Sequence, residues 1–131
     1  MNAAEDYILL GLRLGKHVDG LVDAYYGPQD LKDAVDDEPP VHASELVEDA
    51  IALRDSLEDG WLRDQVNGCL TAARVLAGEQ LSYTEEVEGS HGVRPERTPE
   101  EQFERVHAEL DELLPGDGSL GERRLAWRER H

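Results

Sequence analysis

The sequence predicts an all-α fold, a bundle of about five to seven short helices in which neighbouring helices pair as antiparallel hairpins. Three observations lead to this prediction. Apolar residues recur every three or four positions through most of the chain, which is the spacing of one buried helical face. No stretch alternates apolar and polar residues for long enough to indicate a strand. Prolines, glycines and capping residues divide the periodic pattern into short segments.

The first predicted helix ends at Gly27 and carries an apolar stripe on one face. The stripe consists of Tyr7, Leu10, Leu14, Val18, Leu21 and Tyr25. Gly11, Gly15 and Gly20 interrupt it, and each glycine costs a helix interior about 1 kcal/mol relative to alanine. Two alternatives are open here: close helix packing through Gly11 and Gly15, or a break near Asp19 and Gly20.

Three more helices follow from proline, serine and glycine positions. Pro28 suits the first position of a second helix that extends to about Asp37, and the Pro39–Pro40 pair ends it. Ser44 is expected to cap a third helix, which Gly60 ends. A fourth helix begins within about three residues, so the third and fourth should form an antiparallel hairpin. Their apolar stripes are Leu46, Ala50, Leu53 and Leu57 in the third helix, and Leu62, Val66, Cys69, Ala73 and Leu76 in the fourth.

Two further helix starts have the spacing of a capping box, in which a hydroxyl and a carboxylate three residues later satisfy backbone N–H groups. One runs from Ser82 to Glu85 and the other from Thr98 to Glu101, where Pro99 is expected at the first helical position. The sequence therefore predicts a fifth and a sixth helix after these caps.

The sixth helix is expected to turn four apolar side chains inward and to end at Pro115. These are Phe103, Val106, Leu110 and Leu113. A last helix runs from Ser119 towards Arg130. The residues Gly116 to Gly121 have the glycine spacing of a dinucleotide-binding turn, but a helix rather than a strand precedes them and Asp117 would repel a phosphate. We interpret this segment as a turn between two helices.

Composition limits the classes of function. The 131 residues include 13 Lys and Arg against 30 Asp and Glu, a formal net charge of −17. A chain this acidic repels phosphate groups, so we expect no nucleic-acid partner, and the arginines of the last helix should pair with acidic neighbours. The single cysteine, Cys69, cannot form an internal disulfide, and neither an export signal nor an apolar run of membrane-spanning length is apparent. We expect a cytoplasmic protein without membrane contact, in which residues 1–131 form a single helical domain or the amino-terminal segment of a longer protein.

No residue pattern predicts a catalytic or metal site. His107 and Asp111 share a helical face, but His107 lies beside apolar residues and is interpreted as a partly buried residue at the edge of the core. His91 stands alone in a loop. Cys69 has no basic neighbour that would stabilise a thiolate, so it is interpreted as a core residue. We therefore expect no catalytic residue, no metal ligand and no cofactor in this chain.

One cluster remains as a candidate binding feature. Asp23, Tyr25 and Tyr26 stand at the predicted end of the first helix, where their polar tips are candidates to face a cleft. The alternative is that both rings only cover the helix end, with their hydroxyls in water.

Four blocks of the sequence also resemble a known family. They are Asp23-Ala24-Tyr25-Tyr26-Gly27-Pro28, Gly60-Trp61-Leu62-Arg63-Asp64-Gln65, Leu81-Ser82-Tyr83 and Gly92-Val93-Arg94-Pro95. Together they resemble the amino-terminal portion of a bacterial domain-of-unknown-function family whose longer members look like zinc metallopeptidases. The resemblance covers most of the chain. In that family the zinc ligands lie far downstream in a Gly-His-His-x-x-Glu or similar motif, which this sequence does not match, so no catalytic residue is carried over.

The resemblance implies a non-catalytic helical segment that shapes or covers a substrate channel, with the missing carboxy-terminal part of such a protein as its partner. The end of the sequence within a predicted helix, at Arg130 and His131, is what an excised segment would look like. The alternative is a stand-alone acidic helical module that docks a protein partner or associates with itself as a homo-oligomer. The glycines of the first helix motivate that alternative.

Overall fold

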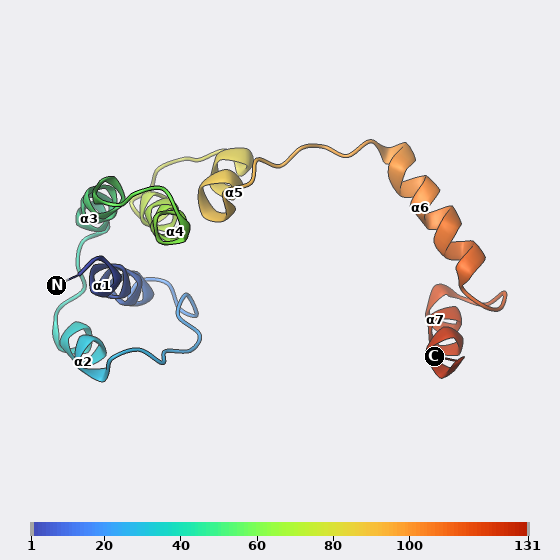
Figure 1. The fold of residues 1–131 in the computed structure, drawn as a ribbon, viewed down its shortest axis with the longest axis horizontal. Helices are drawn as coiled ribbons and strands as arrows, with labels where there is room; N and C mark the ends of the chain where they lie inside the picture. The colour runs from blue at the N-terminus through green and yellow to red at the C-terminus, as the bar shows by residue number, and fades with distance from the viewer. Residues whose placement is uncertain (1, 131) are drawn as a thin grey trace. The chain divides into compact units, whose positions relative to one another are not determined.

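A computed structural model describes residues 2–130, and within them it contains seven helices and no strand (Figure 1). The helices are α1 (Ala3–Gly15), α2 (Gln29–Asp37), α3 (Ala43–Ser56), α4 (Trp61–Leu76), α5 (Tyr83–His91), α6 (Glu100–Leu113) and α7 (Leu120–Arg130). The all-α prediction is confirmed. The chain divides into two compact units, one reaching to Pro95 with α1 to α5, the other starting at Glu96 with α6 and α7.

The core of the first unit lies between α1, α3 and α4, which are seen nearly end-on in Figure 1. Its buried members are Leu10, Leu14, Leu46, Ala50, Val66, Leu70 and Ala73, with Tyr7, Val41, Val47, Leu53, Leu57, Cys69 and Leu76 packed around them. Most residues of the stripe predicted for α3, and most residues of the stripe predicted for α4, belong to this set. A loop of only four residues, 57–60, joins these helices, so they form the expected antiparallel hairpin. Cys69 packs against the core, as predicted.

The first helix is shorter than its apolar stripe. It ends at Gly15, and the chain then turns through Gly20, whose φ of +77° is readily adopted only by glycine. A Cβ on Gly15 would lie 3.3 Å from a methyl group of Val22, so the segment after the turn folds back on the end of α1. Of the two alternatives, the break near Gly20 is therefore the one observed, and Gly11 has no neighbour that would require a glycine.

Three side chains at the end of α1 hold α2 and the residues after it. The Lys16 Nζ donates to the carbonyl oxygens of Val35 and Glu38, each at 2.5 Å. The Arg13 guanidinium donates to both carboxylate oxygens of Glu38, at 2.7 and 3.2 Å. His17 Nε2 lies 2.7 Å from the Val41 carbonyl oxygen. The bond from Lys16 to Val35 satisfies one of the carbonyl groups that the end of α2 leaves without a partner.

The predicted cap at Ser82 is confirmed. The Glu85 amide donates to Ser82 Oγ at 3.3 Å, and the Glu85 carboxylate accepts from the Ser82 amide at 2.9 Å. The same reciprocal pair joins Ser119 and Glu122 at the start of α7, a second capping box that was not predicted.

Two other predicted caps are wrong. α3 begins one residue before Ser44, and the ring of His42 accepts from the Ser44 amide at 3.3 Å instead. Pro99 keeps an extended backbone with ψ of 138°, which moves the start of α6 to Glu100 and leaves Thr98 outside the helix.

α5 lies close to α4 at one glycine. A Cβ on Gly89 would clash with the hydroxyl of Thr71, which is almost fully buried and donates to the Asn67 carbonyl oxygen at 2.9 Å. Gly68 of α4 faces the backbone of Ser90 in the same contact, where an added Cβ would lie 3.5 Å from the Ser90 carbonyl oxygen. Small residues thus set the distance between these two helices.

Candidate functional site

The predicted cleft residues separate into two that line a pocket and one that does not. Asp23 and Tyr25 border a pocket of about 470 Å³ between the end of α1, the following loop and α2. The Tyr25 hydroxyl donates to the Pro28 carbonyl oxygen at 2.8 Å. Tyr26 is 96% exposed and is not among the lining residues.

Both lysines of the chain border this pocket, and each already has a partner within the chain. Lys16 is bound to the end of α2 as described above, and the Lys32 Nζ forms an ion pair with Asp36 at 2.7 Å. Because the pocket also contains Asp19, Asp23 and Asp36, its charges do not favour an anion. The pocket has room for a small polar group, and its contacts indicate no particular chemistry.

The candidate metal ligands do not converge. Among residues 2–130, no group of three or more His, Cys, Asp or Glu side chains lies close enough to hold a metal ion. His107 is exposed rather than partly buried, so its interpretation as a residue at the edge of the core is wrong. The Asp111 carboxylate is instead bound by the Arg123 guanidinium at 2.5 Å. Burial raises the pKa of the Cys69 thiol, which keeps it protonated near neutral pH.

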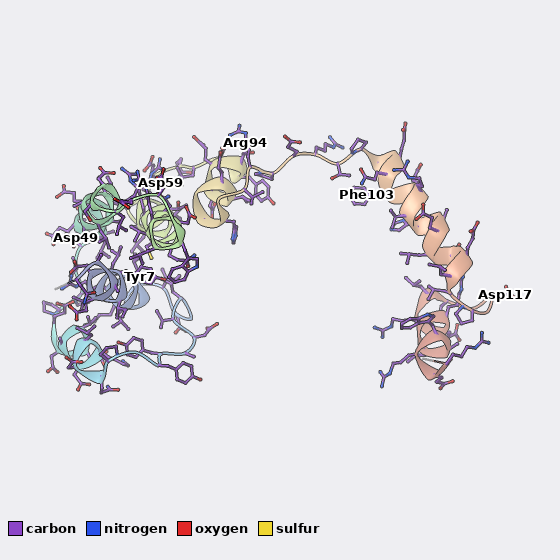
Figure 2. All side chains as sticks on the ribbon, in the orientation of Figure 1. Tyr7, Asp49, Asp59, Arg94, Phe103 and Asp117 are labelled. Carbon is purple, nitrogen blue, oxygen red and sulfur yellow. The ribbon has the colours of Figure 1, made fainter. Side chains whose placement is uncertain are left out.

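The largest departure from the prediction is the apolar stripe of α6. Its four members were expected to point into a core, and they are exposed instead. Their exposed fractions are 53% for Phe103, 43% for Val106, 48% for Leu110 and 71% for Leu113. Phe103 near the start of α6 and Asp117 in the turn after it are labelled in Figure 2. In the described part of this unit the only other helix is α7, and it does not cover the stripe.

The stripe has the spacing of a helix that packs against another helix. Its residues are three, four and three positions apart, as at the a and d positions of a coiled coil. Glu100 and Glu109 occupy positions beside it in the same repeat. We define the four residues from Phe103 to Leu113 as the α6 stripe.

The two helices of this unit carry opposite charge. α6 contains one arginine against six carboxylates, a net charge of −5, and α7 contains four arginines against two glutamates, a net charge of +2. Within the described residues, Arg124 and Arg128 of α7 form no ion pair. The outer surface of this unit therefore presents an acidic and a basic helix.

A single arginine connects the two helices. The Arg123 guanidinium donates to the Asp111 carboxylate, to the Asp111 carbonyl oxygen at 2.5 Å and to the Leu114 carbonyl oxygen at 3.0 Å. Its side chain is only 15% exposed, and its Nε is buried without a partner among the described residues. The expectation that the arginines of the last helix pair with acidic neighbours is thus confirmed for Arg123. The sequence offered no signal that Arg123 rather than its neighbours would cap α6.

Beside this junction, an apolar pocket of about 450 Å³ continues the α6 stripe. Leu110 and Leu114 line it from the end of α6, and Leu120 lines it from α7. Leu120 is itself 68% exposed. The apolar surface of this unit is therefore shared by both helices.

Within the described residues, no helix combines the length and the apolar character needed to span a bilayer. The chain matches no protein-family model, no curated protein and no solved structure.

Proposed function

We propose that this chain is a non-catalytic helical module that binds another protein surface through α6 and α7. The observation that supports the proposal is the exposure of the whole α6 stripe, from Phe103 to Leu113. An amphipathic helix gains most of its stability by burying its apolar face, and an exposed apolar patch with polar borders is typical of a protein-binding surface. A partner helix or groove would bury the stripe through side chains at helical spacing.

The reactive side chains support the non-catalytic part of the proposal. The Cys69 thiol has a raised pKa and packs against the core, which opposes a role as nucleophile. Asp111, which shares a helical face with His107, is bound by Arg123. We also propose a cytoplasmic location, because the one cysteine is kept as a thiol by burial and a reducing compartment suits such a chain.

Site-specific crosslinking in the native cell tests the docking surface. A photoreactive residue at Val106 or Leu110 should give crosslinked products, and one at Val75, which is also exposed on a helix, should not. Because Val75 lies on α4, it controls for non-specific capture by an exposed apolar position. Absence of products from Val106 and Leu110 would contradict the proposal.

The family resemblance supports a second candidate function, that of a helical segment covering the substrate channel of a metallopeptidase-like protein. The pocket that Asp23 and Tyr25 line is the feature of the structure that favours it. An antibody to residues 44–77 would then detect a native product several times heavier than the 14.6 kDa of this chain. A native product of about that mass would contradict this second candidate and leave the docking module.

A further inference from the structure

We infer that the partner of the α6 stripe is a second copy of this chain, with α6 of each copy packed against α7 of the other. The inference rests on the proposed docking function and names its partner. Its basis is the opposite charge of two helices that one chain presents together.

The charges of α6 and α7 favour one of the two ways in which two copies can pack. Packing α6 against α6 would bring two helices of net charge −5 together, with Glu100 and Glu109 beside each stripe. Like charges at such a contact oppose association. Packing α6 against α7 brings those carboxylates to a helix of net charge +2 instead.

α7 has a face suited to this contact. Leu120, Arg124 and Arg128 are spaced by four residues and lie on one side of the helix, whereas Arg123 is used in the junction with α6. Leu120 and Leu125 are both more than half exposed, so this helix also offers apolar surface. The helices are of similar length, about 21 Å for α6 and about 17 Å for α7 from the rise of 1.5 Å per residue.

The junction at Arg123 makes the contact reciprocal. Because the Arg123 guanidinium binds the carboxy-terminal end of α6, each copy carries both the α6 stripe with its flanking carboxylates and the basic face of α7. A two-fold axis between two copies would then form the same α6 to α7 contact twice, which is how most symmetric dimers are built. Both stripes would be buried, and neither copy would be left with an open acidic face.

The test is a charge-swap experiment on the full chain, with association measured by sedimentation equilibrium in about 0.15 M salt, which screens the repulsion between two copies of net charge −17. The unaltered chain should dimerise. One variant carries Glu100→Arg and Glu109→Arg, and the other carries Arg124→Glu and Arg128→Glu. Each variant alone should dimerise at least about tenfold more weakly, because its swapped side chains then face side chains of the same sign on the other copy. Mixing the two should restore association, since the arginines introduced on α6 of one variant then face the glutamates introduced on α7 of the other.

The control is Glu86→Arg, which changes an exposed charge on α5 and should leave the dimer unchanged. Circular dichroism of each variant checks that the helices still form. A dimer that Phe103→Glu abolishes but that neither charge swap weakens would overturn the α6 to α7 arrangement. If the chain stays monomeric while Val106 crosslinks to another protein, the second copy is overturned as the partner. The proposed docking function would still hold in that case. A monomer without crosslinks from Val106 would overturn both.

Discussion

Replacing Gly89 by alanine should destabilise the first unit, even though alanine is the better helix former. The new Cβ would clash with the Thr71 hydroxyl and lie 3.2 and 3.3 Å from two carbons of that side chain. Thr71 is buried and donates to the Asn67 carbonyl oxygen, so it cannot turn away without losing that hydrogen bond. Overpacking of this kind costs about 1–3 kcal/mol, and the better helix propensity of alanine offsets about 1 kcal/mol of that cost. We expect a net loss of about 1 kcal/mol in the free energy of unfolding.

Urea unfolding followed by far-ultraviolet circular dichroism measures the change, and amide hydrogen exchange in α4 and α5 localises it. In a Thr71→Ala background the clashing hydroxyl and methyl groups are gone, so Gly89→Ala should become neutral or stabilising. Gly11→Ala is the matched control, because a Cβ at that helical position meets nothing within 4 Å and should stabilise by about 1 kcal/mol. If Gly89→Ala stabilised the unaltered chain as much as Gly11→Ala does, the close contact between α4 and α5 would be refuted.

Three further predictions concern charges and caps. The hydrogen bond from Arg13 holds the pKa of Glu38 in the folded state below its ordinary value of 4.5. The stability that this pair contributes is therefore complete above pH 4.5, and it is lost as the pH falls through the lower pKa of the folded state. Arg13→Gln should therefore reduce stability by about 1 kcal/mol at pH 7, and thermal melts should show the difference from the unaltered chain closing under acid conditions. Ser82→Ala should cost about 1 kcal/mol and speed amide exchange at the start of α5, whereas Ser119→Ala should speed exchange only at the start of α7. Raising the potassium chloride concentration should raise the melting temperature, because it screens the repulsion among −17 net charges, and an unchanged melt would mean that these charges do not oppose folding.

The helices of the first unit could be predicted wherever local sequence and packing agree. In α3 and α4 the apolar stripes meet each other across a four-residue loop, so the pattern and the core coincide. The segment after Gly15 could not be predicted in the same way. Val18 and Leu21 continue the helical spacing of α1, but both are exposed, because α1 ends at Gly15 and the turn that follows takes them out of line with the core. Periodicity alone does not show where a helix stops if the stripe runs past a glycine.

The candidate site shows a different limit of sequence reasoning. The α6 stripe was found correctly as a face at helical spacing, but the expectation that its side chains point into a core was wrong, because α7 does not cover them. Periodicity identifies an apolar face and carries no information on which surface packs against it. The charge difference between α6 and α7 is present in the sequence, yet its meaning depends on their being neighbours joined by Arg123.

The position of Lys16 has a consequence for chemical labelling. Lys16 and Lys32 are the only lysine side chains in the chain, so an amine-reactive dye has two side-chain targets. The Lys32 ammonium is held by one surface carboxylate, whereas the Lys16 ammonium donates to two backbone carbonyls at the end of α2. Acylation of Lys16 therefore requires the contact between α1 and α2 to open first. The rate at which Lys16 itself is acylated, followed by peptide mapping, would then time that opening, with no mutation needed to observe it.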